Sequence, residues 1–153
     1  MKARVVARRR RESWSCRASA SDILVEYDAP LFATRRPVFL RGSIDQPGAV
    51  AVATLKHRQL AGYGVLRPCM SGFKIGPLFA DDEFAAQALF QAMAARAEGQ
   101  PVFLDVPEVN AAALALARRH AMRPVFETVR MYNRAAPPLP VGRIYGVTSF
   151  ELG

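Results

Sequence analysis

Two acidic side chains on either side of a proline are candidates for a general base. Asp105 and Glu108 flank Pro107, and a carboxylate held there can take a proton from an attacking amine. The same residues also have structural interpretations, because Asp105 falls on one face of an apolar run and Glu108 precedes a helix start. The pair is therefore a candidate base with an equally simple structural explanation.

The histidines and cysteines lack the spacing of a metal site. His57 and His120 are the only histidines, and neither has ligand-type neighbours at the intervals typical of zinc sites. Two cysteines, Cys16 and Cys69, cannot form a disulfide framework and favour a reducing, cytoplasmic setting. A Cys69 thiol facing a basic cleft would be reactive, but an inert, half-buried thiol is the simpler interpretation. We expect no metal.

Polar residues stand at the starts of two predicted helices. Asp81, Asp82 and Glu83 precede and open an apolar-periodic segment, where carboxylates accept hydrogen bonds from free backbone N–H groups and match the helix dipole. Asn110 occupies the corresponding position before a short alanine-rich segment. Both sites are predicted helix N-caps.

The basic charge of the chain is concentrated at its N-terminus. The net charge is +8, and residues 1–20 hold seven Lys or Arg side chains against a single acid, Glu12. This segment has neither strand alternation nor a helical stripe, so we expect a disordered basic tail. A nucleic-acid arm and an organelle presequence are alternatives to a plain solvated tail, which such charge blocks usually are. No apolar run reaches the roughly 18–20 residues that a membrane-spanning helix needs.

Residues 21–153 carry the pattern of one folded domain. Hydrophobic residues make up 51% of the 153-residue chain, which suffices for one core. Capping and breaker residues predict helices over residues 22–28 (stopped by Pro30), within 37–45, and over 83–98 and 111–120. Apolar runs predict strands over residues 49–55, 60–66, 73–79, 101–106, 124–132 and 147–152. The expected core includes Phe79, Phe84, Phe90, Met93, Phe103, Met122 and Phe126. This order predicts an α/β (α+β) fold.

The segment from Val50 to Tyr132 resembles the GNAT superfamily of N-acetyltransferases. It has a strand hairpin (AVAVATL and LAGYGVLRP), a strand entering a long helix (FKIGPLFADDEFAAQALF), the strand VFLDV, and an Asn-capped helix leading to PVFETVRMY. Asn110 before its helix is similar to the family's segment beside the thiol end of acetyl-CoA. The resemblance implies a mixed, mostly antiparallel sheet flanked by helices, with a splayed cleft between residues 73–79 and 101–106.

Shorter motifs resemble the second, C-terminal domain of tandem two-domain bacterial GNAT proteins. These motifs are YDAPLF (27–32), YGVLRP (63–68), FKIGPLFADD (73–82), LDVPE-x-N (104–110) and FELG (150–153). The resemblance covers about 130 residues and implies a catalytic GNAT domain as partner. Residues 1–20 would then be either a misplaced start or the remnant of a split gene, and residues 21–153 the C-terminal half of a larger protein.

Three features depart from the family pattern. GNAT proteins bind the pyrophosphate of coenzyme A with backbone N–H groups of a Gly-rich loop at a helix N-terminus. Here Pro77 lacks that donor and Asp81 and Asp82 place negative charge at the same position. The later helix also lacks the Tyr that protonates the leaving thiolate in many members, and Ala121 replaces the Gly of the following turn.

The resemblance implies acetyl transfer from acetyl-CoA to an amine acceptor, a small molecule or a peptide. It implies acetyl-CoA contacts at Ile75, Gly76, Leu78, Phe79 and Asn110. Glu108 and Tyr132 are the candidate catalytic residues, although Tyr132 is also explained as a strand aromatic. The alternative is a non-catalytic binding or dimerisation module that completes a separate GNAT catalytic domain, which the altered anion loop favours.

Overall fold

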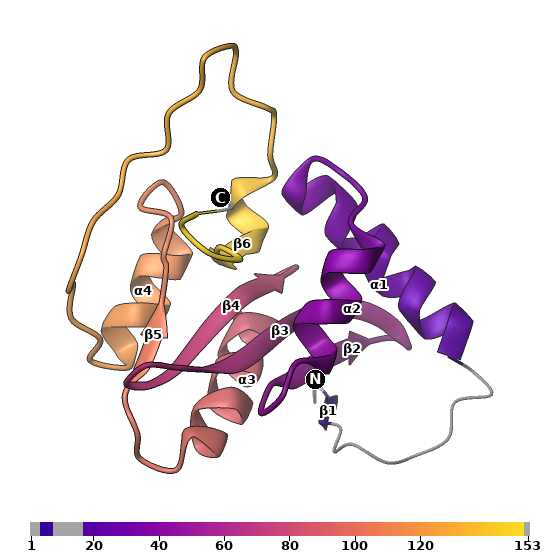
Figure 1. The fold of residues 1–153 in the computed structure, drawn as a ribbon, viewed down its shortest axis with the longest axis horizontal. Helices are drawn as coiled ribbons and strands as arrows, with labels where there is room; N and C mark the ends of the chain where they lie inside the picture. The colour runs from indigo at the N-terminus through magenta and orange to yellow at the C-terminus, as the bar shows by residue number, and fades with distance from the viewer. Residues whose placement is uncertain (1–3, 8–16, 152–153) are drawn as a thin grey trace.

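The computed structural model describes residues 4–7 and 17–151 as one sheet with helices on both faces (Figure 1). The helices are α1 Arg17–Phe32, α2 Pro37–Asp45, α3 Glu83–Ala94 and α4 Ala111–Arg119, with 3-10 turns η1 Ala95–Ala97 and η2 Val141–Arg143. The strands are β1 Arg4–Ala7, β2 Val50–Lys56, β3 Gln59–Cys69, β4 Gly72–Ala80, β5 Val102–Leu104 and β6 Ile144–Gly146. No helix in these residues is long and apolar enough to span a membrane.

The sheet is mixed and mostly antiparallel. Strands β1 to β5 lie side by side in chain order. Every neighbouring pair is antiparallel except β4 and β5, which are parallel. The last strand, β6, pairs antiparallel with β4 and not with the outer edge of β5. The predicted fold class, an α/β domain with a mostly antiparallel sheet flanked by helices, is confirmed.

The sheet separates two hydrophobic cores, because successive side chains of a strand point to opposite faces. Leu78 of β4 packs in the core that α3 and α4 cover, and the next residue, Phe79, packs in the core under α1 and α2. The first core includes Leu66, Ile75, Leu78, Leu89, Phe90, Met93 and Leu116. The second includes Val25, Leu31, Leu40, Tyr63, Val65, Phe79 and Ile144.

The first helix is longer than predicted. It runs from Arg17 to Phe32, and Pro30 lies inside its last turn instead of stopping it. Contacts outside the helix hold this turn, because Leu31 is buried and the Asp28 carboxylate accepts two hydrogen bonds from Arg36. The helix predicted within residues 37–45 is confirmed as α2.

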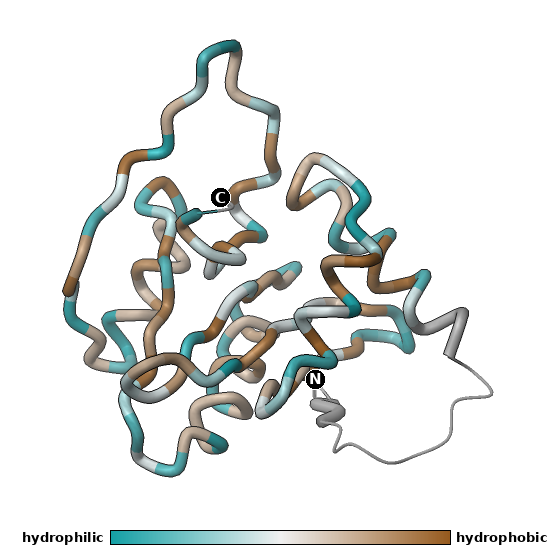
Figure 2. Tube along the Cα trace, viewed as in Figure 1, coloured by the Kyte–Doolittle hydropathy of each residue, from teal (hydrophilic) through white to brown (hydrophobic). Residues whose placement is uncertain are grey.

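Two strands predicted near the C-terminus are wrong. Residues 124–132 form an exposed irregular loop, and the last strand is β6 instead of residues 147–152, of which residue 152 lies outside the described part. A strand needs a neighbour for its backbone groups, and β6 enters the sheet beside β4 while residues 124–132 stay outside it. Figure 2 shows hydrophobic residues along this loop, where Val125, Val129 and Met131 are 79%, 84% and 87% exposed.

Two of the aromatic residues expected in the core lie on the surface. Phe84 and Phe126 are 85% and 65% exposed. Phe84 stands in the first turn of α3 beside the buried Ala85, on the helix side that faces solvent. Phe126 lies in the exposed loop, where its ring contacts only the edge of Phe150 among the described aromatic side chains, with 5.5 Å between centroids.

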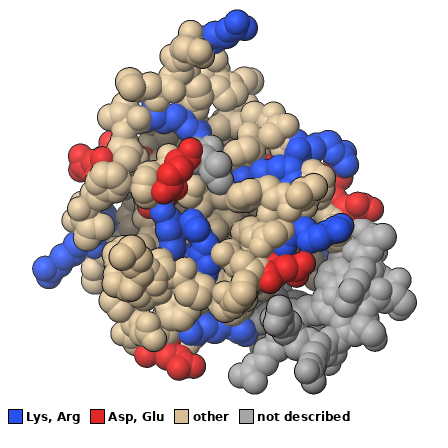
Figure 3. All heavy atoms as spheres, in the orientation of Figure 1, with Lys and Arg blue, Asp and Glu red and all other residues tan. Residues whose placement is uncertain are grey.

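Part of the basic N-terminal segment has regular structure. Arg4–Ala7 form β1 and pair antiparallel with β2, and residues 17–20 belong to the first turn of α1. The sequence predicts disorder for this segment. Residues 4–7 instead pair with the edge of β2, whose backbone N–H and C=O groups need partners. The other residues of the segment, Cys16 among them, lie outside the described part. Figure 3 shows basic and acidic side chains interspersed over the viewed face.

Candidate functional site

Strands β4 and β5 separate partway along their length. They pair in parallel from Phe73 with Val102 to Ile75 with Leu104, and no further. Beyond this point β4 pairs with β6 instead, at Leu78 with Gly146 and at Phe79 with Ile144. The sheet therefore has the splayed wedge that the resemblance implies, and it lies beside the residues proposed to contact acetyl-CoA.

The chain itself fills this wedge with residues 144–149, which we call the inserted segment. A Cβ atom built on Gly146 would lie 2.4 Å from Leu104 Cδ1 and 3.2 Å from Leu78 Cβ, so Gly146 fits tightly between the two strands. The backbone N–H of Val147 donates to the carbonyl of Asp105 at 3.0 Å. A Cβ on Gly76 would meet the Thr148 carbonyl oxygen at 2.5 Å. Backbone of the inserted segment thus contacts both sides of the wedge.

The residues predicted to contact acetyl-CoA along β4 are all buried. Ile75 and Leu78 are 0% exposed and Phe79 is 2% exposed, and Gly76 is covered by Thr148. Their side chains pack in the two cores. Contact with a ligand at this place would require the inserted segment to leave the wedge.

Asn110 joins the start of α4 to the inserted segment. Its Oδ1 accepts from the backbone N–H groups of Ala112 at 3.1 Å and Ala113 at 3.2 Å, which confirms the predicted N-cap. Its Nδ2 donates to the carbonyls of Val141 at 3.0 Å and Ile144 at 2.8 Å. Asn110 is 5% exposed, so its hydrogen bonds are made within the protein.

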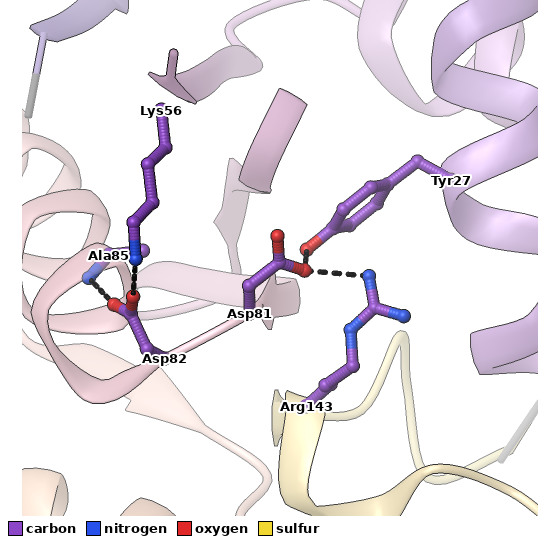
Figure 4. A network of polar contacts seen from close by, with 6 residues as sticks. All are labelled: Tyr27, Lys56, Asp81, Asp82, Ala85 and Arg143. Atoms are coloured by element: carbon purple, nitrogen blue, oxygen red, sulfur yellow. Dashed lines mark hydrogen bonds and ion pairs between the residues drawn. The ribbon is translucent and has the colours of Figure 1, made fainter. Parts of the chain in front are cut away.

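The N-terminus of α3 is capped by a carboxylate (Figure 4). Asp82 Oδ1 accepts from the Ala85 backbone N–H at 2.9 Å, and Oδ2 lies 3.0 Å from Lys56 Nζ. The hydrogen bond from Ala85 and the nearby Lys56 ammonium lower the pKa of Asp82. The predicted cap is confirmed, and it occupies the place where a helix N-terminus would bind an external anion.

Asp81 connects three parts of the fold in the same view. Its Oδ1 accepts from the Tyr27 hydroxyl at 2.9 Å and from Arg143 Nη2 at 2.7 Å. Tyr27 comes from α1 and Arg143 from η2, directly before the inserted segment (Figure 4). Burial raises the pKa of Tyr27, and the Asp81 carboxylate adds to that rise. Through these two hydrogen bonds, Asp81 connects α1 with η2, which directly precedes the inserted segment.

Replacing Asp82 by Ala is expected to destabilise the fold by about 1 kcal/mol, the usual value of a helix N-cap. Because the native pKa of Asp82 lies below its ordinary value of 3.8, this contribution is present above that value and is lost as pH falls through the native pKa. Urea unfolding of both proteins at pH 7 and in acid measures it. The difference between the proteins should shrink in acid, and a constant difference would contradict the capping role.

The candidate catalytic residues do not form one site. Glu108 is exposed in the turn before α4, and Tyr132 is 44% exposed in the irregular loop. Asp105 pairs with Lys74 at 2.6 Å. Within residues 21–151, no hydrogen bond connects Glu108 with Tyr132 or Asp105. Their catalytic roles stay predictions.

The histidines and Cys69 have local surroundings of ordinary kinds. His120 packs on Phe90 with 4.3 Å between ring centroids, and its Nε2 lies 2.8 Å from Gln87 Nε2. Burial and the nearby Arg119 lower the pKa of His120. His57 is exposed in the β2–β3 turn, and Cys69 is an exposed free thiol instead of the half-buried one expected. The part of the chain that the structure describes contains no cluster of three or more metal-ligating side chains.

The turn after α4 keeps the left-handed geometry that usually requires Gly. Ala121 has φ of 53°, which costs an L-residue about 1 kcal/mol. The turn is closed by hydrogen bonds from Ala121 N–H to the Arg118 carbonyl and from Met122 N–H to the Ala117 carbonyl, both at 3.0 Å. These bonds satisfy helix-end carbonyls and offset the strain.

The sequence did not indicate a buried polar group under α1. Asp28 is 0% exposed and accepts hydrogen bonds from Arg36 Nε and Nη2, both at 2.7 Å, and from the Tyr63 hydroxyl. Burial raises the pKa of Tyr63 well above its ordinary value, and the charge of Asp28 raises it further. The only available signal was a pair of acid and base eight positions apart near a helix end, which is too common to single out.

Comparison with known proteins identifies a family whose model matches this chain and solved structures that share its fold. The model of the acetyltransferase (GNAT) domain matches residues 24–146. Holothin acyltransferase from Pseudoalteromonas sp. (strain SANK 73390) is 23% identical over 133 residues, which cover 86% of this chain and 45% of that protein.

Two solved structures share the fold. A proposed acetyltransferase from Pyrococcus horikoshii has a TM-score of 0.73 and 22% identity, over 97% of this chain and 46% of its own. An aminoglycoside acetyltransferase from an uncultured soil metagenomic sample, solved with sisomicin, has a TM-score of 0.58 and 14% identity, over 88% of this chain and 97% of its own. The chain thus spans less than half of the acyltransferase and of the Pyrococcus horikoshii protein. With the domain model matched over most of its length, the chain belongs to the GNAT family of acetyltransferases.

Proposed function

We propose that this chain is an acetyltransferase-fold module that does not bind acetyl-CoA and that supports acyl transfer to an amine by a separate catalytic GNAT domain. The observation that carries the proposal is the filled wedge. Gly146 packs closely between Leu78 and Leu104, where a Cβ atom would lie 3.2 Å from Leu78 Cβ and 2.4 Å from Leu104 Cδ1. The two strands that would separate around the cofactor instead contact the inserted segment, with β6 paired to β4 and Val147 N–H bonded to Asp105.

The α3 N-terminus also does not fit the pyrophosphate of coenzyme A. Asp82 already accepts the hydrogen bond of the Ala85 N–H, so that donor is used internally. Asp81 and Glu83 add two further carboxylates at the same helix start, and their charges repel a phosphate. The basic side chains nearby, Lys56 and Arg143, are paired with Asp82 and Asp81. The wedge between β4 and β5 and the N-terminus of α3 are therefore both occupied by contacts within the chain.

The greater length of the relatives supports the proposal that this chain works beside a separate catalytic domain. The chain matches 45% of holothin acyltransferase and 46% of the Pyrococcus horikoshii protein. This agrees with the resemblance to the second domain of tandem GNAT proteins. In such an arrangement the other domain carries out acyl transfer, and an amine is the acceptor by analogy with the aminoglycoside acetyltransferase that shares this fold.

The second candidate is acetyl transfer from acetyl-CoA by the chain itself. It is favoured by one observation, the match of the GNAT domain model to residues 24–146, which includes the strands β4, β5 and β6. This candidate requires the inserted segment to leave β4 before the cofactor enters.

An activity assay of the whole chain separates the two candidates. The purified protein is incubated with acetyl-CoA and spermidine, a lysine peptide or sisomicin, and free coenzyme A is quantified by chromatography, because the exposed Cys69 would react with thiol reagents. The proposal predicts the same rate of release as in buffer for every amine. A rate that saturates with acetyl-CoA concentration would establish the second candidate in its place.

A further inference from the structure

A cavity of about 300 Å³ lies between α2 and the sheet, and the inserted segment separates it from the wedge. One wall is formed by Phe39, Gly42 and Ser43 on a single face of α2 and by Gln46, the C-cap residue that follows the helix. The opposite wall is formed by Arg67 of β3, Gly76 of β4, and Thr148 and Ser149 of the inserted segment. The volume is at the small end of the range of ligand sites.

Gly42 is an unusual residue for its position. It lies inside α2, where Gly is less favourable than Ala because it loses more backbone entropy on folding. A Cβ atom built on Gly42 would have no atom within 4 Å, so no close packing requires the absence of a side chain. The effect of Gly42 is to leave the helix side of the cavity open.

Among the described residues that line the cavity, Arg67 is the one with a charged side chain. Between residues 21 and 151, Lys56, Lys74, Arg36 and Arg143 each pair with an aspartate, whereas Arg67 has no carboxylate oxygen within 4 Å. Figure 3 shows basic side chains gathered near the centre of the viewed face, with an acidic side chain beside them. A guanidinium without a partner at a cavity wall favours an anion, which its planar fork binds with two hydrogen bonds.

Among the described residues, Glu151 is an acidic group that senses the charge of Arg67. A hydrogen bond from Ser149 chiefly lowers the pKa of Glu151, and the charges of Lys74 and Arg67 contribute less. Glu151 is exposed and does not line the cavity. The described lining of the cavity therefore contains the positive charge of Arg67 and no acidic side chain.

We propose that this cavity binds a small organic anion, a carboxylate or phosphate monoester on an aromatic or aliphatic body. The anionic group lies at Arg67, and the body packs against Phe39 and the open face at Gly42. Ser43 of α2 and Gln46 after it provide polar atoms, and Gln46 Nε2 donates to the Ser43 carbonyl at 2.9 Å. The inference goes beyond the proposed function, since the site holds whether or not the chain transfers an acyl group.

Calorimetric titration of the whole chain with three phenyl compounds of similar shape, two of them anionic and one neutral, tests the proposal. Phenylacetate and phenyl phosphate carry the charge, and phenylacetamide is the neutral control. At least one anion is expected to bind with a Kd below about 1 mM, and phenylacetamide at least about tenfold more weakly. No binding by either anion, or equal binding of phenylacetamide, would overturn the proposal.

Three variants locate the binding. Arg67→Gln is expected to weaken anion binding by at least about tenfold, whereas Arg41→Gln, the same change on an exposed residue of α2 outside the cavity, changes it by less than about twofold. Gly42→Leu fills the helix side and should abolish binding without lowering the melting temperature, since no atom lies within 4 Å of its Cβ. Unchanged affinity in Arg67→Gln or in a folded Gly42→Leu protein would place the anion elsewhere and refute the site.

Discussion

Replacing Asp28 by Ala is expected to lower the free energy of unfolding by about 3–5 kcal/mol, because it leaves the Arg36 guanidinium buried without its counter-ion. Asp28 is 0% exposed and Arg36 is 8% exposed, with two hydrogen bonds of 2.7 Å between them. The Tyr63 hydroxyl loses its acceptor in the same variant. The stacking of Arg36 on Phe32, at 3.7 Å from the ring centroid, does not replace the lost charge partner.

Urea unfolding followed by circular dichroism measures this effect, and a surface pair provides the matched control. Glu26 and Arg35 form an ion pair whose side chains are both 62% exposed, so Glu26→Ala should cost less than about 1 kcal/mol. Asp28→Ala/Arg36→Met should recover part of the loss, since it removes the stranded charge. Equal costs for Asp28→Ala and Glu26→Ala would mean that the buried pair does not hold α1 in place.

Replacing Asn110 by Ala is expected to cost about 2–4 kcal/mol, more than a helix cap alone. The variant loses the acceptor for two N–H groups of α4 and the donor for the carbonyls of Val141 and Ile144. The lost cap accounts for about 1 kcal/mol. The rest comes from buried carbonyl groups left without a donor at the start of the inserted segment.

Asn110→Ser separates the two contributions. A Ser hydroxyl can cap α4 but is too short to reach both carbonyls as well, so this variant should be intermediate in stability. Amide hydrogen exchange gives a local measure, since Val147 N–H donates to Asp105 within the inserted segment. We expect faster exchange at Val147 in both variants. Equal stability of Asn110→Ser and the unchanged chain would show that the amide does not hold the segment.

Features that depend on a few neighbouring residues could be predicted from the sequence. The caps at Asp82 and Asn110 need only a polar side chain and the next three backbone N–H groups. The β2–β3 hairpin and α2 likewise follow from local apolar periodicity and breaker residues. The splay between β4 and β5 came from the resemblance and is present in the sheet.

Features that depend on distant residues could not be predicted. Tyr63 bonds Asp28 across 35 positions, and nothing local marks that pair. Residues 124–132 have the composition of a strand, yet the position beside β4 is taken by Ile144–Gly146, whose sequence IYG gives a weaker strand signal. Strand propensity depends on neighbours, so the occupant of the wedge was decided by tertiary contacts such as the tight fit of Gly146.

The most direct test of the closed wedge is calorimetric titration of the whole chain with coenzyme A and acetyl-CoA. The filled wedge predicts no saturable heat for either compound up to about 1 mM. The Asp81→Asn/Asp82→Asn variant should behave in the same way, because removing these charges leaves Gly146 between Leu78 and Leu104. One-to-one binding of acetyl-CoA to the unchanged chain with a micromolar Kd would contradict the account, since it would mean that the inserted segment yields its place to the cofactor.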